Sequence, residues 1–215
     1  MKKLSLMGLT LVSIITLAAC SSGDENVKVS DGSKASESTT VSESKSTAES
    51  STKEEATSEP GKRSNPVALG KTATFDTNFF NEDGEEFDAN LSITLSNVIR
   101  GEEAMNYLTS ANEFNEPAPE GNEWIIFQVD EKLNKGDADV PYFESGFFKV
   151  IDSKGAELEQ TSFATLADGE NWGSADMYEG ATLTGKHAVY APVGEDILLE
   201  YTGNDFDTTV FFALK

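Results

Sequence analysis

The sequence predicts an all-β fold, and two observations support this prediction. Alternating apolar and polar residues, or short apolar runs, recur along the chain at residues 91–96, 125–130, 148–151, 197–201 and 209–214. Such patterns are typical of half-buried antiparallel strands. Turn signals rich in glycine, asparagine and aspartate separate these stretches. About seven short strands of this kind predict an immunoglobulin-like antiparallel β-sandwich, which we place in residues 66–215.

Two further stretches do not alternate and are longer than a sandwich needs for connection. Residues 102–110 predict one or two helical turns, followed by a loop at 117–119. Residues 161–176 predict a long polar loop that carries Trp172. We therefore expect features particular to this protein to lie in residues 101–122 and 161–176.

The N-terminus predicts a lipoprotein signal peptide over residues 1–19. Lys2 and Lys3 precede an apolar run, which is shorter than the roughly 20 apolar residues of a membrane-spanning helix. The Leu-Ala-Ala-Cys sequence at 17–20 predicts a lipobox, in which a diacylglyceryl group is attached to Cys20 and the chain is cut before it. Two acyl chains hold a membrane stably. We therefore expect Cys20, the only cysteine, to anchor the protein at the extracellular face of the cell membrane.

Residues 20–65, which begin with the lipidated cysteine, predict a disordered tether. Ser, Thr, Glu, Lys and Ala dominate this stretch, and the first aromatic residue of the chain is Phe75. Such a composition cannot bury enough apolar surface to offset the entropy lost on ordering. A flexible coil of this length spans roughly 40 Å, so it would hold the sandwich away from the lipid. Its hydroxyl groups leave glycosylation of the tether open.

The negative charge lies in the predicted sandwich. The whole chain has a formal net charge of −22, and residues 66–215 contain eight Lys or Arg against twenty-nine Asp or Glu. Nucleic acid as a partner is excluded, because its phosphates need Lys and Arg. A domain this acidic is also not expected to lie on anionic lipid. Solubility of an exposed monomer, or attraction of cations or basic partners, would explain the charge.

Several motifs together resemble a known family. They are residues 68–71 before the first strand, 121–134, 148–155, 179–192 and 198–201. Their order is similar to that in the domain of unknown function 4352, an immunoglobulin-like family of Gram-positive lipoproteins and secreted proteins. The resemblance implies a sandwich similar to that of a mycobacterial immunoprotective extracellular antigen. It implies no agreed activity and no catalytic or binding residues.

Few residues suggest chemistry. His187 is the only histidine, shares a strand face with Val189, and is expected to be a structural, hydrogen-bonded residue rather than a catalytic base. No catalytic residue and no cofactor are expected. Carboxylate-rich turns leave Ca²⁺ as an alternative, with candidate ligands at Asp137, Asp139, Asp205 and Asp207. Trp172 is the candidate for partner binding if it is exposed, although packing onto the sandwich is the alternative.

Three functions are compatible with these features. The first is a membrane-anchored extracellular lipoprotein that displays the acidic sandwich as a binding module for an envelope protein or wall polymer. The second is an accessory factor of an envelope transport or assembly complex. The third is a carboxylate-dependent wall-glycan hydrolase, which needs a suitable separation between two carboxylates. The absence of catalytic motifs favours the first, a protein that is not an enzyme.

Overall fold

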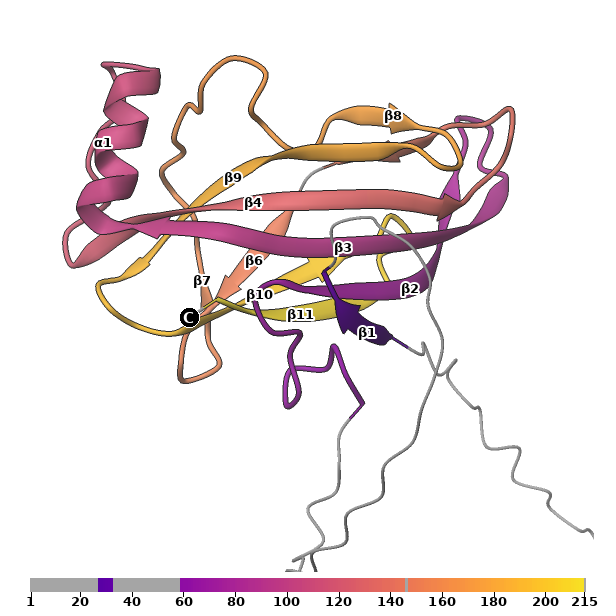
Figure 1. Ribbon diagram of the computed structural model, residues 1–215, viewed down its shortest axis with the longest axis horizontal. Coiled ribbons are helices and arrows are strands. Elements are labelled where there is room, and N and C mark those ends of the chain that lie inside the picture. The colour runs from indigo at the N-terminus through magenta and orange to yellow at the C-terminus, as the bar shows by residue number, and fades with distance from the viewer. Residues whose placement is uncertain (1–26, 33–58, 146, 215) are drawn as a thin grey trace, which may run out of the picture.

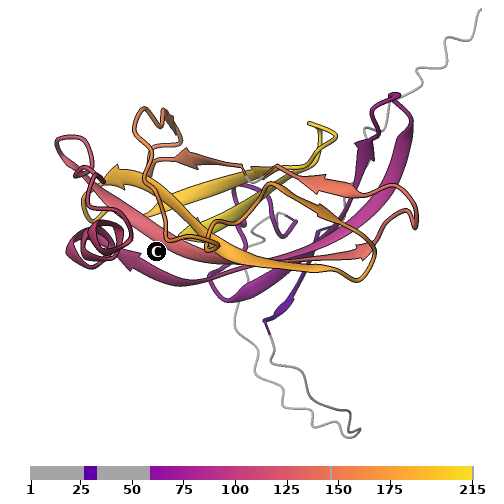
Figure 2. The ribbon, with the colours of Figure 1, turned by 90° about the horizontal axis from the view of Figure 1, so that it is seen from above.

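The computed structural model describes residues 27–32, 59–145 and 147–214, and within them two antiparallel sheets stack as layers (Figures 1 and 2). The first sheet pairs, in order, β1 (Lys28–Asp31), β2 (Lys71–Phe80), β3 (Glu86–Arg100), β4 (Asn122–Lys135) and β9 (Thr182–Pro192). The second pairs β11 (Thr209–Leu214), β10 (Ile197–Thr202), β6 (Phe148–Ile151) and β7 (Glu157–Leu158). A separate ribbon joins β5 (Tyr142–Glu144) to β8 (Ala175–Met177).

The main core lies between the two sheets and follows from strand alternation. In β3, Leu91, Ile93 and Leu95 are buried while the residues between them are partly exposed. Phe148 and Val150 of β6 face them from the second sheet, within the same cluster of buried side chains. Because strand side chains point alternately to opposite faces, each sheet presents one apolar face to the other. The predicted all-β class and antiparallel sandwich are confirmed.

The predicted helical turns are also confirmed, as α1 (Gly101–Ala111). Gly101 has a φ of +57° and begins the helix directly after the last residue of β3, in a backbone region that glycine enters without a Cβ clash. A Cβ at this position would lie 2.9 Å from Oε2 of Glu123. Figure 1 shows α1 standing at one end of the long strands, which we call the α1 end.

The prediction of a disordered tether over 20–65 is wrong for two short pieces of it. Residues 28–31 form β1, which pairs with Lys71–Thr74 of β2, and Lys71 forms an ion pair with Asp31. Val27 is buried against Gly61, and Gly61 itself accepts a backbone hydrogen bond from Phe211 of β11. Composition did not predict these pieces because they are stabilised by pairing with an existing sheet edge and by packing on an existing core. The remaining tether lies outside the described residues.

Candidate functional site

The α1 end has its own hydrophobic cluster, separate from the main core. Ile126 of β4 points into this cluster, while its neighbours Ile125 and Phe127 point into the main core. The first sheet is therefore covered on both faces here, by the second sheet on one side and by α1 with its neighbouring loops on the other. The buried members of the cluster are Ala104, Leu108, Trp124, Ile126, Leu166 and Tyr190.

Two loops meet at this end: the post-helix loop (residues 112–121) and the long loop (residues 159–174). The side-chain amide of Asn115 donates a hydrogen bond to the carbonyl of Thr165, and its oxygen accepts one from the Thr165 amide, both at 2.8 Å. The indole of Trp124 donates to the carbonyl of Glu116 at 2.9 Å. These bonds fix both loops to each other and to the buried cluster, so the stretches that the sequence singled out form one surface.

A second connection joins the helix to the long loop and to β9. Lys186 donates a hydrogen bond to Glu170 at 2.7 Å and lies 4.4 Å from the ring centroid of Tyr107, whose hydroxyl also donates to Glu170. These two hydrogen bonds hold the pKa of the Glu170 carboxyl below its usual value, and the bond from Lys186 has the larger effect. The positive charge of Lys186 is thereby neutralised within the fold.

The fixed loops expose two large aromatic side chains. Phe114 on the post-helix loop is 81% exposed, and Phe163 on the long loop is 85% exposed. Between α1 and the post-helix loop lies an open groove of about 270 Å³. Its apolar wall consists of Met105, Pro117, Ala118 and Trp124, and its polar edge includes Glu102, Asn106, Asn122 and Glu123. Large apolar side chains held in solvent by rigid loops are typical of contact surfaces.

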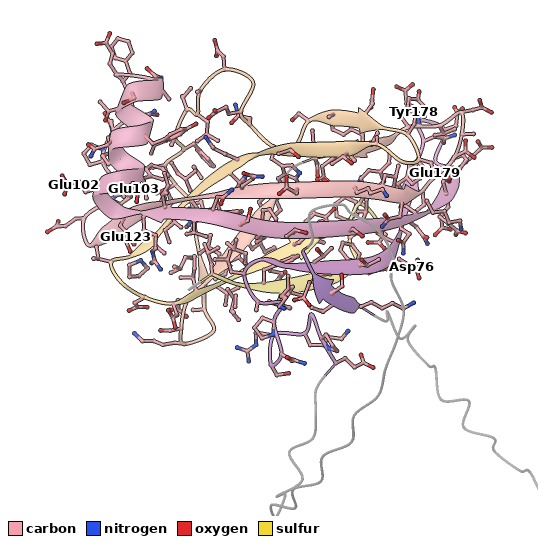
Figure 3. The ribbon with its side chains drawn as sticks, in the orientation of Figure 1. Asp76, Glu102, Glu103, Glu123, Tyr178 and Glu179 are labelled. Atoms are coloured by element: carbon pink, nitrogen blue, oxygen red, sulfur yellow. The ribbon has the colours of Figure 1, made fainter. Side chains whose placement is uncertain are left out.

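The same surface is strongly negative. Residues 101–123 and 159–172 contain nine carboxylates and no lysine or arginine. The nearest cations are engaged, since Arg100 pairs with Glu123 at 2.9 Å and Lys186 with Glu170. Figure 3 shows Glu102, Glu103 and Glu123 together at the α1 end, far from Asp76, Tyr178 and Glu179 at the opposite end. We call the two exposed phenylalanines, the groove and these carboxylates the α1-end surface.

A wider groove of about 430 Å³ lies near the opposite end of the second sheet. Phe147 and Phe206 flank it, and Lys149 and Asn204 contribute polar groups. Lys149 is held by Glu200 at 3.1 Å, and Asn204 donates to the carbonyl of Phe143 at 2.7 Å. Lys149 and Asn204 thus serve the fold.

A pair of carboxyl groups is buried inside the main core. Glu131 of β4 and Glu144 of β5 are 0% and 1% exposed. The indole of Trp172 donates to Oε2 of Glu131 at 3.0 Å, and the hydroxyl of Tyr201 donates to Glu144 at 3.0 Å. Oε1 of Glu131 has no hydrogen-bond donor among the described residues. Tyr142 completes the group with a 3.2 Å hydroxyl contact to Tyr201.

The environment keeps Glu131 protonated at neutral pH. Burial, the adjacent charge of Glu144 and a hydrogen bond to Glu144 raise the pKa of Glu131 from 4.5 to about 10, against the opposing bond from Trp172. A proton on Glu131 lets one carboxyl group donate to the other, as two adjacent acids cannot both ionise in a dry interior. Sequence reasoning missed this pair, although Glu131 shares strand parity with Val129 and Leu133, both of which face the core.

Trp172 is buried, so the expectation that it packs onto the sandwich is confirmed and its alternative role as an exposed partner-binding residue is wrong. Its side chain is 4% exposed and packs on Phe148 with the ring centroids 5.1 Å apart. Gly185 of β9 permits this, because a Cβ there would lie 2.5 Å from the Trp172 amide nitrogen. The long loop therefore presses Trp172 into the core and displays Phe163 instead.

The other predicted site residues are placed as follows. His187 is half-buried and packs among the rings of Phe127, Phe148 and Trp172, and desolvation lowers its pKa to about 4, so it is neutral at pH 7. Cys20 and residues 1–19 lie outside the described residues, and no helix among the described residues is long and apolar enough to cross a membrane.

The four candidate Ca²⁺ ligands do not converge on one place. Asp137 uses its carboxylate to accept the amides of Asp139 and Val140. Burial alone would raise the pKa of Asp205, but hydrogen bonds from Thr208 and its neighbours outweigh this and lower it. No group of three metal-ligating side chains occurs in the described part of the chain, and Ca²⁺ binding stays a prediction.

Comparison with protein families, curated proteins and solved structures finds no match to this chain. The resemblance to the domain of unknown function 4352 therefore stays a prediction, and the function is argued from the chain's own surface.

Proposed function

We propose that this protein is an extracellular lipoprotein, anchored to the cell membrane through Cys20, that uses its acidic sandwich as a binding module. The signal and lipobox at 1–20 support the location. The α1-end surface is the observation that carries the binding role. It combines two nearly fully exposed phenylalanines with a groove and a cation-free rim, on loops held by hydrogen bonds.

Binding is a better account of this surface than catalysis. Its carboxylates lie on the surface beside apolar groups, where they orient and attract a partner. The two carboxyls that do lie side by side, Glu131 and Glu144, are enclosed in the core and tied to Trp172 and Tyr201. A glycosidase needs its acid and its base to flank a bound sugar, which an enclosed pair does not do.

The location is tested with Cys20→Ala in the full-length protein, expressed in the cells that make it. We expect the variant to lose labelling by radioactive palmitate and to leave the membrane fraction. Cys20→Ser serves as a second variant, because serine keeps the size but not the thiol. Membrane retention of both variants without a lipid label would overturn the anchor.

The binding role is tested by cross-linking on intact cells. Full-length protein with Phe114→Ser and Phe163→Ser should lose the cross-linked partner that the wild type captures. The matched control is Phe206→Asn, because Phe206 is equally exposed, at 84%, and asparagine tolerates its φ of +61°. Equal capture by the wild type and the double variant would contradict the assignment of this surface.

A further inference from the structure

We propose that the partner of the α1-end surface is a basic polypeptide segment, which inserts one apolar side chain into the groove while its lysines or arginines face the rim. This inference rests on the proposed function and adds the chemistry of the partner. It depends on three properties of the surface: its shape, its charge and its rigidity.

The shape fits a side chain rather than a flat surface. The groove of about 270 Å³ is open on one side and bounded by Met105 of α1, by Trp124 and by the post-helix loop at Pro117 and Ala118. This volume holds one or two large apolar side chains. Phe114 and Phe163 stand in solvent on the same two joined loops, so they add apolar contact outside the groove.

The charge selects a basic occupant. Arg100 and Lys186, the cations at the edge of this surface, are already paired with Glu123 and Glu170. The exposed carboxylates Glu102, Glu103 and Glu120 face solvent, with no cation in residues 101–123. Complementary charge speeds encounter and excludes partners of the wrong sign. An anionic wall polymer or an anionic lipid surface would be repelled.

The rigidity of this surface lowers the conformational entropy that is lost on binding. The Asn115–Thr165 bonds, the Trp124 bond to Glu116 and the Tyr107–Glu170–Lys186 connection hold α1, both loops and β9 as one unit. A surface ordered before contact loses little further freedom when a partner binds. The flexible member of the complex is then the basic segment.

The experiment uses the full-length protein in detergent micelles and fluorescent synthetic peptides, with binding followed by anisotropy. The first peptide interleaves lysines with leucine and tryptophan, the second keeps the lysines but replaces the apolar residues by glycine and serine, and the third replaces the lysines by glutamates. We expect the first peptide to bind at least about 10-fold more tightly than either other peptide. Its affinity should fall as salt is raised, because surface charges are screened.

Two sets of variants locate the binding. Glu102→Gln, Glu103→Gln and Glu120→Gln together should weaken the first peptide about 5- to 20-fold and flatten its salt dependence. Asn106→Trp, which fills the groove from an exposed helix position, should weaken it by a similar factor. The matched control removes three charges beyond the far ends of β2 and β4, with Glu82→Gln, Asp83→Asn and Asp139→Asn, and should change affinity less than about 2-fold.

The outcomes separate this inference from the proposed function. Binding of the first peptide that is equally weakened by the control set would overturn the inference, since it would reflect net charge alone. Binding of a soluble peptidoglycan fragment in place of the peptide would also overturn it. If no peptide binds while Phe114 and Phe163 are still needed for cross-linking on cells, the basic partner is wrong and the proposed function stands. If that cross-linking is also independent of both residues, the proposed function fails with it.

Discussion

Carboxylates occupy two contrasting places in this acidic chain. Glu131 and Glu144 lie side by side in the main core, with almost no exposed surface. Glu102, Glu103 and Glu120 lie at the α1 end, where they face solvent. The core pair shares its environment with Trp172 and two tyrosines, and burial there raises the pKa of Glu131.

The contrast teaches that the local environment, not residue type, assigns the role. In the core the Glu131 carboxyl acts as a neutral hydrogen-bonding side chain, and its removal leaves the Trp172 indole without its acceptor. At the α1 end a carboxylate is a charge offered to a partner, and its removal leaves the fold intact. Each difference predicts an effect on stability, and the effects decrease from the core outward.

The largest effect is expected for Glu131→Ala. The change leaves the Trp172 indole without its acceptor and opens a cavity beside Glu144, which should lower the free energy of unfolding by about 3 kcal/mol. Urea unfolding at pH 5 measures this change in the free energy of unfolding. At that pH, keeping Glu131 protonated in the folded state costs the wild-type protein little free energy. Glu131→Gln is the control, because glutamine keeps one donor and one acceptor and should stay within about 1 kcal/mol of wild type.

The second effect is a pH dependence that Glu131 imposes. Its pKa is 4.5 when unfolded and about 10 when folded, so the folded state binds the extra proton. The stabilisation is fully present below pH 4.5 and falls as the pH rises toward 10, at a slope of up to about 1.4 kcal/mol per pH unit. Glu131→Gln should remove this slope between pH 7 and 9.

His187 opposes this trend only in acid. Its pKa is 6.5 when unfolded and about 4 when folded, so its contribution is complete above pH 6.5 and is lost as the pH falls toward 4. Wild-type stability should therefore be highest between about pH 4.5 and 6.5. Parallel curves for wild type and Glu131→Gln above pH 7 would show that Glu131 is ionised in the folded state.

The sequence predicts the buried carboxyl pair and the α1 end to different extents. Strand parity predicted the sheets, and the same parity in β4 indicates that Glu131 points inward beside Val129 and Leu133. It does not identify Glu144 as the neighbour, because β5 reaches the core through contacts distant in sequence. Trp172 was ambiguous for the same reason, since its burial depends on the close approach of Gly185.

At the α1 end, the sequence identified the two unusual stretches but did not predict that they contact each other. The lengths of 101–122 and 161–176 marked them as unusual, and the helix was predicted within the first. Their contact depends on single side chains such as Asn115, which no period or composition reveals. β1 escaped prediction because four residues gain stability only by pairing with an existing edge.

The third effect tests the junction between the two loops. Asn115→Ala removes both hydrogen bonds to Thr165 and a third to the carbonyl of Leu108. We expect a loss of about 1 to 2 kcal/mol, with faster hydrogen exchange at the Thr165 amide than in the wild type. Asn106→Ala, at an exposed helix position, is the control and should leave that exchange rate unchanged. Unaltered exchange in Asn115→Ala would mean that the loops are held by the buried cluster alone.

The smallest effect is expected for the α1-end carboxylates themselves. Glu113→Gln with Glu120→Gln removes two exposed charges from the post-helix loop, and stability should change by less than about 0.5 kcal/mol. At low salt the variant should be slightly more stable than the wild type, because the substitutions relieve repulsion within a strongly negative domain. Salt should abolish that gain through screening. Urea unfolding at low and high salt measures both, and a loss above about 1 kcal/mol would show that these carboxylates hold the loops in place rather than remaining free for a partner.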